Sequence, residues 1–331
     1  MGPSSQTELP DVHLEAEPSS RDYVYVMPSS KARAPEPVWR YVALFCLTLV
    51  TTTLAGVDHY ASFYAAFRTI ELPFSTWELI VRGLWYSVSI LAILGAHEFG
   101  HYYACRYYKV DASLPYFLPM PFVLTGTFGA FIRIRQPIPG KRELFDIGIA
   151  GPIAGFVVAI PVLLIGMYLS SVVEIPKDFD GTVFELGEPL LFKAVAWLFW
   201  GTPPEGYSIN LHPMAFAAWF GLLATALNLF PMGQLDGGHI SYAVLGRWST
   251  AVTVGTVACL VGLSFLSSSW VVWTVLTVSM LLAFGPRHPR TVDEHVPLDG
   301  TRLWLAVFAL VMFVLCFSPA PIEPMDLVGG R

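Results

Sequence analysis

Long apolar stretches constrain this chain more than any other feature of its sequence. A helix needs about 20 apolar residues to cross the hydrocarbon core of a bilayer. In this chain 54% of the residues are hydrophobic and 13% are charged, whereas soluble domains are roughly 25% charged. The sequence therefore predicts an all-α polytopic membrane protein. The candidate spans lie in Val38–Val57, Trp77–Cys105, Leu144–Val172, His212–Met232, Thr250–Gly285 and Thr301–Phe317.

The number of spans depends on the stretch Thr250–Gly285, which is too long for one ordinary crossing. Three serines, Ser267–Ser269, lie near its middle. A split there gives a tight pair of spans and seven transmembrane helices in all. One long tilted or re-entrant piece gives six.

The two ends of the chain differ from the apolar middle. Residues 1–37 are rich in proline and serine and carry mixed charge, so they are expected to form a disordered tail. This tail is too acidic for a transit peptide and lacks the apolar core of a signal peptide. The predicted transmembrane domain covers residues 38–318, with its core at 77–245, and residues 319–331 form a C-terminal tail.

Charge predicts the orientation and argues against one class of partner. With the N-terminus in the cytosol, most Lys and Arg fall in inner segments, which is the positive-inside pattern. The seven-span arrangement then puts the C-terminus outside. A net charge of -6 without a basic cluster argues against a nucleic-acid binder.

The segment His97-Glu98-Phe99-Gly100-His101 lies at the end of the second apolar stretch. Histidines four residues apart share one face of a helix, so both imidazoles can bind one metal ion. Glu98 lies beside that face, where a carboxylate can take a proton from a water molecule polarised by the metal. Such polar groups are expensive inside a membrane unless they serve a function.

A third ligand is predicted from the end of the fourth apolar stretch. Pro231 and the glycines that follow it should interrupt the helix. The predicted topology then brings Asp236 to about the depth of His97 and His101. Two imidazoles and one carboxylate leave a fourth tetrahedral position for water, as in catalytic zinc sites. Asn228 either satisfies the broken backbone or donates to the oxyanion that forms when an amide is attacked.

Two further side chains could either take part in the metal site or have a structural role. Cys105 continues the stripe of His97 and His101 by one more turn, where a thiol could approach zinc, but packing in the core is favoured. His239 follows Asp236 by three residues and is expected to cap or support the site rather than bind the metal. The four cysteines form no C-x-x-C pair and no disulfide framework.

The stretch Asp111–Gly140 fits neither a span nor an ordinary loop. Its prolines forbid a helix. Its second part, Thr125–Arg135, alternates apolar and polar residues at its end and contains glycines that allow bends. Irregular backbone at membrane depth is tolerated only where it lines a cavity in the protein. We therefore expect a membrane-dipping, β-hairpin-like segment between the second and third spans. It either pairs with an extended substrate or merely seals the site.

Several motifs together resemble the site-2 protease family of intramembrane zinc metalloproteases. The resemblance covers roughly residues 77 to 245. His288-Pro289-Arg290 is similar to the branch that includes plant chloroplast members and their bacterial relatives. The motifs are His97–His101, Gly126-Thr127-Phe128-Gly129, Ala150-Gly151-Pro152 and the stretch from Asn228 to Gly238.

The resemblance implies one zinc ion per chain, bound by His97, His101 and Asp236. It implies that Glu98 is the general base and that Asn228 assists near the scissile carbonyl. Gly126, Thr127, Phe128 and Gly129 become candidate substrate-binding residues. Many relatives carry a PDZ domain after the third span, and here the corresponding loop, Glu174–Asn210, is too short for one.

The family also implies a setting and a substrate. The setting is the lipid bilayer of a bacterial cytoplasmic membrane, with the active site toward the cytosol. The substrate is a single-span membrane protein already trimmed on its outer side, such as an anti-sigma factor or another membrane-tethered regulator. The sequence leaves the oligomeric state open. The competing hypotheses are a transporter or channel with a structural metal site, which gives Glu98 no role, and an inactive membrane scaffold.

Overall fold

The computed structural model describes residues 36–325, except 69, 122–123, 177–182, 234, 267–268, 286–290, 292, 294–295 and 320–321. The predicted N-terminal tail, apart from its last two residues, and the motif His288-Pro289-Arg290 lie outside the described residues.

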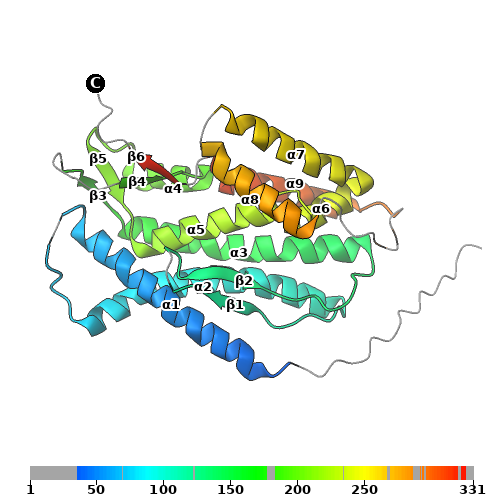
Figure 1. The fold of residues 1–331 in the computed structure, drawn as a ribbon, viewed down its shortest axis with the longest axis horizontal. Coiled ribbons are helices and arrows are strands. Elements are labelled where there is room, and N and C mark those ends of the chain that lie inside the picture. Colours follow the sequence, from blue (N-terminus) through cyan, green and yellow to red (C-terminus); the bar gives the residue numbers. More distant parts are fainter. Residues whose placement is uncertain are drawn as a thin grey trace, which may run out of the picture. The chain divides into compact units, whose positions relative to one another are not determined.

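Helices dominate the described part of the chain, as the apolar stretches predicted (Figure 1). Each predicted span corresponds to at least one helix. The helices are α1 (Val38–Ala65), α2 (Thr76–Tyr107), α3 (Lys141–Leu169), α4 (Leu190–Trp200), α5 (Pro213–Leu229), α6 (Asp236–Leu245), α7 (Ser249–Ser264), α8 (Ser269–Phe284) and α9 (Gly300–Cys316), with a short 3-10 turn, η1 (Gly246–Trp248), between α6 and α7.

Four helical segments are long and apolar enough to cross a membrane by length and composition. They are α1, α2, α3 and the continuous run from Asp236 to Ser264, while α4, α5, α9 and the apolar part of α8 are shorter. The stretch Thr250–Gly285 does divide near its serines into α7 and α8, which pack against each other. The number of crossings stays a prediction.

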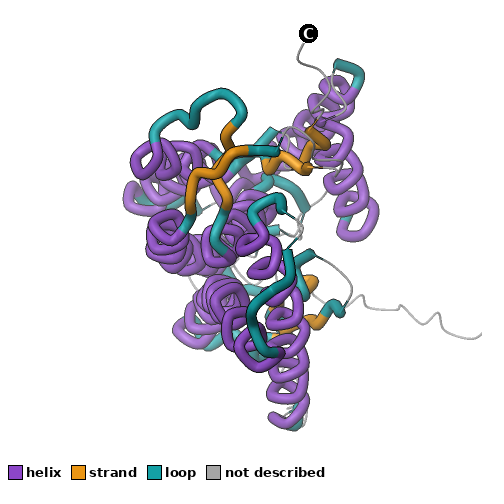
Figure 2. The backbone as a smooth tube through the Cα atoms, turned by 90° about the vertical axis from the view of Figure 1, so that its left-hand side faces the viewer, coloured by secondary structure: helices purple, strands orange, loops and turns teal. Residues whose placement is uncertain are grey.

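The strands form antiparallel pairs and no larger sheet in the described part of the chain. Figure 2 looks down several of the helices and shows strands crossing in front of their ends. The sequence predicted only the first pair. The pairs are β1 (Tyr116–Pro119) with β2 (Thr127–Phe131), β3 (Ser171–Glu174) with β5 (Tyr207–Asn210), and β4 (Val183–Leu186) with β6 (Ile322–Met325).

The pair β1–β2 is the expected hairpin between the second and third long helices. It runs beside α1 and α2 (Figure 1). Near its base the hydroxyl of Tyr116 donates to that of Tyr41, 3.2 Å away in the first turn of α1. Near its tip Gly126 contacts Thr51, ten residues further along the helix, which is about 15 Å at 1.5 Å per residue. The hairpin therefore follows α1 inward from the end where α1 begins.

Helix α3 lies at the centre of the packing and contacts α2, α4, α5, α6 and α9. It holds its helical form through Pro152 and Pro161. Each of these prolines removes one backbone hydrogen bond; Pro152 is buried, whereas Pro161 is exposed. The core shared by these helices includes Tyr86, Phe145 and Trp219, each at most 1% exposed.

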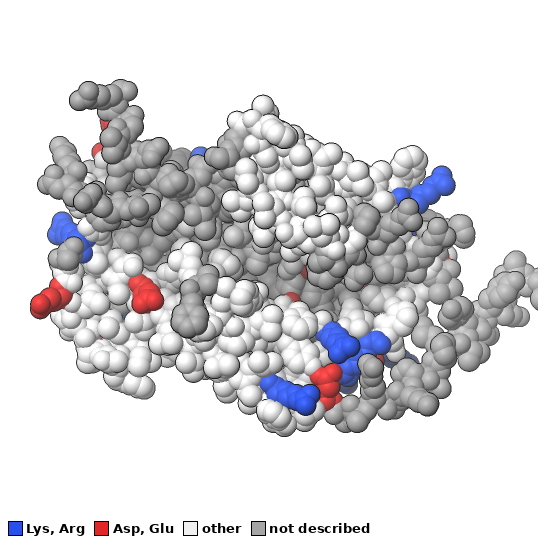
Figure 3. All heavy atoms as spheres, in the orientation of Figure 1, with Lys and Arg blue, Asp and Glu red and all other residues white. Residues whose placement is uncertain are grey.

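Two features distinguish the ends of the helical bundle. On the face shown in Figure 3, most of the Lys and Arg lie toward the end where α1 begins. The C-terminal segment, expected only to be a tail, forms β6 and pairs with β4 in the connection between α3 and α5. This pairing brings β6 to the side of the bundle where α3 ends, a long-range contact that no local pattern predicts.

Helices α1 and α2 approach closely through two glycines. A Cβ atom on Gly56 would lie 2.2 Å from the carbonyl oxygen of Gly83, and one on Gly83 would lie 2.6 Å from the carbonyl oxygen of Thr53. Such distances are too short for any side chain, so the contact requires glycine on both helices.

We predict that Gly56→Ala lowers the stability of the protein in detergent by about 1–3 kcal/mol, the usual range for overpacking. The measurement is the midpoint of thermal or denaturant unfolding. Gly262→Ala in α7 is the matched control, because a Cβ atom there meets nothing within 4 Å. Equal midpoints for the two variants would contradict the close packing of α1 against α2.

Candidate metal centre

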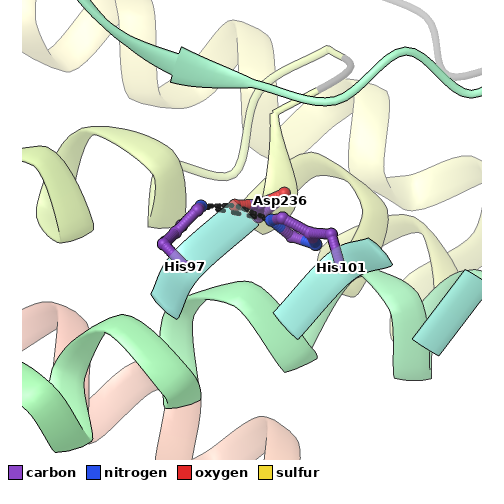
Figure 4. A group of neighbouring side chains, drawn as sticks. All are labelled: His97, His101 and Asp236. Atoms are coloured by element: carbon purple, nitrogen blue, oxygen red, sulfur yellow. Dashed lines mark hydrogen bonds and ion pairs between the residues drawn. The ribbon is translucent and has the colours of Figure 1, made fainter. Parts of the chain in front are cut away.

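Two histidines of α2 point at a common position (Figure 4). His97 and His101 are one turn apart, and their Nε2 atoms are 3.1 Å from each other. Each residue is 6% exposed. The four-residue spacing of the H-E-x-x-H motif thus puts both imidazoles on the buried face of one helix, as predicted from helix geometry.

The third side chain comes from a distant part of the chain. Helix α5 ends at Leu229, two residues before Pro231, and a short turn leads to Asp236, the first residue of α6. Its Oδ2 atom is 3.2 Å from Nε2 of His97 and 3.3 Å from Nε2 of His101. A carboxylate at a helix N-terminus is favoured by the helix dipole.

These three atoms match the requirements of a zinc ion. Zinc binds imidazole nitrogen and carboxylate oxygen at about 2.0–2.2 Å, so neighbouring ligands of a tetrahedral site lie about 3.3 Å apart. The ligand atoms of His97, His101 and Asp236 are separated by 3.1 to 3.3 Å. Three protein ligands leave one position for water or substrate, as in a catalytic site.

The orientation of His101 is fixed from α3. Its Nδ1 atom is 2.7 Å from the carbonyl oxygen of Ile147. A carbonyl can only accept, so Nδ1 carries the proton and Nε2 presents a lone pair to the metal position. Metal-binding histidines are commonly held in this way by a partner for the second nitrogen.

Glycines of α3 make room for the imidazoles. A Cβ atom on Gly151 would lie 2.1 Å from Nε2 of His101, and one on Gly155 would lie 3.1 Å from Cβ of His97. In the sequence, Gly151 stood out only as part of the motif Ala150-Gly151-Pro152. The structure shows that the same small residues also shape the metal centre, and only the three-dimensional arrangement reveals this.

Glu98 lies beside the metal centre rather than in it. Its Oε1 atom is 3.9 Å from Nε2 of His97, and the residue is 7% exposed. The backbone of Ile132, just past the end of β2, interacts with its carboxylate. Glu98 therefore stands between the metal position and the hairpin.

Asn228, in the last turn of α5, is also brought to the site. Its Nδ2 atom is 3.3 Å from Nε2 of His97. The carboxamide can therefore reach a group that sits at the metal position. Its predicted role in satisfying the broken backbone and its predicted role toward the oxyanion both stay open on this geometry.

Cys105 and His239, for which the sequence left two roles open, are packed against other residues. Cys105 is fully buried and packs with Val110 and Ile147 in an apolar cluster, as favoured from the sequence. His239 packs its Cβ against Gly148 of α3. Neither belongs to the group of donors formed by His97, His101 and Asp236.

The candidate substrate-binding residues divide into two kinds. Gly126, with a φ of +67°, packs against Thr51, and Thr127 is 2% exposed and donates to the carbonyl of Leu118 at 2.8 Å. By contrast, Phe128 is 69% exposed, and a Cβ atom on Gly129 would meet nothing within 4 Å. The first two residues shape the hairpin, whereas the last two lie open.

An apolar cavity of about 520 Å³ lies on the other face of α2. It is lined by Ala92, Ala96 and Phe99, among others, and by residues of α1 and of the segment around β1. His97 and His101 project from a different face of the helix. The cavity is therefore separated from the metal centre by α2 itself.

Two histidines one turn apart, an adjacent glutamate and a distant carboxylate define the metallopeptidase class. Residues 85–268, more than half of the chain, match the model described as peptidase family M50. The chain therefore belongs to that family, which confirms the resemblance to the site-2 proteases. No PDZ domain interrupts the match, in agreement with the short connection between α3 and α5.

The curated relatives are named as zinc metalloproteases. The chain is 32% identical over 249 residues to the "Probable zinc metalloprotease EGY2, chloroplastic" of Arabidopsis thaliana, which covers 75% of this chain and 44% of the relative. It is 27% identical over 317 residues to the corresponding EGY1 protein of the same plant, covering 89% of this chain and 56% of that relative.

The chain thus spans about half the length of these relatives. Their names place them in chloroplasts, so they give no support to the bacterial cytoplasmic membrane expected from the sequence. No solved structure matches the chain.

We predict that Gly151→Ala greatly reduces the zinc content of the purified protein, because the added methyl group would occupy the space of the His101 ring. Metal content is measured by mass spectrometry after removal of loosely bound ions. Gly255→Ala in α7 is the control, since a Cβ atom there has open space. Full zinc content in Gly151→Ala would show that His101 does not bind metal in the position described.

Proposed function

We propose that the protein is a zinc-dependent intramembrane endopeptidase that cleaves single-span membrane proteins within or near their transmembrane segment. The observation that carries the proposal is a buried group of two imidazoles and a carboxylate, with Glu98 beside it, on helices apolar enough to cross a membrane. The names of the relatives support the zinc metalloprotease activity.

The donor set supplies the parts that hydrolysis of an amide needs. Zinc held by His97, His101 and Asp236 would act as a Lewis acid and make an attacking water more acidic. Glu98 accepts the proton of that water and returns it to the leaving amine. The Asn228 carboxamide donates to the oxygen of the attacked carbonyl as it gains charge.

The hairpin provides a place for the substrate. A peptide bond inside a transmembrane helix has its carbonyl engaged in a backbone hydrogen bond, so the substrate must unwind locally before it can be attacked. At Phe128 and Gly129 the hairpin is not covered by other parts of the protein that the structure describes. An extended segment can pair with this edge by strand addition, which also satisfies the backbone groups that unwinding has exposed.

The orientation is proposed from charge. On the face shown in Figure 3, most of the Lys and Arg lie toward the end of the bundle where α1 begins, so this end would face the cytosol or its equivalent compartment. The pairing of β6 with β4, in the connection between α3 and α5, supports an outer position for the C-terminal segment and hence a seven-span arrangement. His97 and His101 lie ten and six residues before the end of α2, so the metal centre would lie nearer the inner side.

A membrane-tethered regulator such as an anti-sigma factor, trimmed beforehand on its outer side, is the substrate class we propose. The connection between α3 and α5 contains β3, β4, α4 and β5 and lies at the end of the bundle where α3 ends, where we expect it to hinder a substrate that still carries a bulky outer domain.

We predict that Glu98→Gln keeps the bound zinc but lowers cleavage of a transmembrane peptide by at least about a hundredfold, the usual contribution of a general base. Zinc content and cleavage are measured on the same preparation. Glu174→Gln, at the exposed end of β3, serves as the control for the same chemical change. Metal transport without cleavage, or cleavage unaffected by Glu98→Gln, would favour the transporter or a different catalytic group.

We also predict that Asn228→Ala lowers kcat by about 100- to 1000-fold with little change in KM or in zinc content, because an oxyanion donor acts mainly in the transition state. The kinetic constants for a transmembrane peptide provide the measurement. A loss of zinc in parallel with activity would instead assign Asn228 to supporting His97.

A further inference from the structure

The tip of the hairpin is held by side chains of two helices. The carbonyl oxygens of three consecutive residues, Leu124, Thr125 and Gly126, each lie within hydrogen-bonding distance of a side chain. The partners are Nε2 of His59 at 2.7 Å, the hydroxyl of Tyr86 at 2.9 Å and the hydroxyl of Thr51 at 2.7 Å.

Each contact has the chemistry of a donor on a carbonyl. The hydroxyls of Thr51 and Tyr86 can donate, and a ring nitrogen facing a carbonyl must carry its proton. Tyr86 is fully buried and Thr51 is 6% exposed. An unpartnered carbonyl in such surroundings costs several kcal/mol, so these donors stabilise irregular backbone at membrane depth.

Thr51 differs from its neighbours on the same helix. Thr48 and Thr53 donate to the carbonyls four residues earlier in α1, at 2.8 and 2.6 Å, which is the ordinary behaviour of a threonine in a helix. The shortest contact of Thr51 is instead the one to Gly126 across to the hairpin. Gly126 has a positive φ of +67°, and a Cβ atom there would lie 2.6 Å from the Thr51 carbonyl oxygen.

The other end of the hairpin is fixed beside the catalytic carboxylate. The backbone N–H of Ser113 donates to the carbonyl of Arg133 at 2.9 Å, and Ala112 pairs with Ile134. Ile132 interacts with Glu98. A two-stranded hairpin is only marginally stable by itself. This one is held at its base by these contacts and at its tip by Thr51, His59 and Tyr86, so the position of β2 relative to Glu98 depends on both sets of contacts.

We propose that Thr51, His59 and Tyr86 are positioning residues that hold the hairpin tip on α1 and α2, so that strand β2 presents a substrate in register with Glu98. The inference rests on the proposed function. None of the three side chains touches the metal ligands in the contacts described, and they act only through the hairpin.

The first arm of the test measures the position of the hairpin and does not depend on catalytic activity. Spin labels are attached at Phe128→Cys and Tyr107→Cys, two positions that are 69% and 79% exposed, after the exposed Cys46 and Cys259 are replaced by alanine. The distance distribution between the labels is recorded by pulsed electron paramagnetic resonance on the full chain in lipid nanodiscs. Thr51→Val and Tyr86→Phe are expected to broaden it at least twofold.

The second arm measures kinetics in the unlabelled, zinc-loaded protein. Thr51→Val and Tyr86→Phe are each expected to lower kcat/KM for a transmembrane peptide about fivefold, the equivalent of about 1 kcal/mol for one hydrogen bond, chiefly through KM. Zinc content should stay unchanged. Thr51→Ser, which keeps the hydroxyl, should restore both readouts.

Thr53→Val is the matched control, because its hydroxyl bonds only within α1 in the contacts described. Unchanged label distances in both Thr51→Val and Tyr86→Phe, or equal broadening in Thr53→Val, would overturn the proposal. Broadened distances with unchanged kcat/KM would overturn the link to substrate presentation. If the wild type cleaves no transmembrane peptide at all, the proposed function fails, while the distance measurement still decides whether these residues hold the hairpin.

Discussion

The meeting of the Asp236 carboxylate with two imidazoles of α2 is the interaction on which the rest of the structure depends. Three polar groups within 3.3 Å of one another inside an apolar bundle are costly unless a cation neutralises them. Several features serve this meeting directly. The break after α5 brings Asp236 to the site, the glycines of α3 leave space for the rings, and Ile147 fixes one imidazole.

The same constraint explains the hairpin. Backbone without regular hydrogen bonds survives at membrane depth only when the protein supplies partners, and Thr51, Tyr86 and His59 supply them at the tip. The metal centre and the hairpin therefore meet the same requirement, that polar groups in an apolar environment need partners. In each case a polar element is placed in an apolar environment and compensated by named groups on helices that pack closely.

Much of this arrangement could be predicted from the sequence, because its signals are local or strongly periodic. The length of the apolar stretches predicted the helices, prolines excluded a helix from Asp111–Gly140, and the spacing of His97 and His101 placed both rings on one face. The structure also brings Asp236 and Asn228 to these rings, as expected. The sequence did not predict the pairings β3–β5 and β4–β6. It also did not predict the space that Gly151 leaves for the His101 ring, or the side chains that hold the hairpin tip. They depend on contacts between distant segments, and single threonines or tyrosines in apolar helices carry no distinguishing pattern.

The central claim is that one zinc ion is bound by two imidazoles and one carboxylate. X-ray absorption spectroscopy at the zinc edge of the purified protein tests it most directly. The account predicts a first shell of nitrogen and oxygen only, at about 2.0–2.2 Å, with the outer-shell scattering of two imidazoles. A sulfur shell at about 2.3 Å, which would implicate Cys105, or a different number of imidazoles would contradict the assignment.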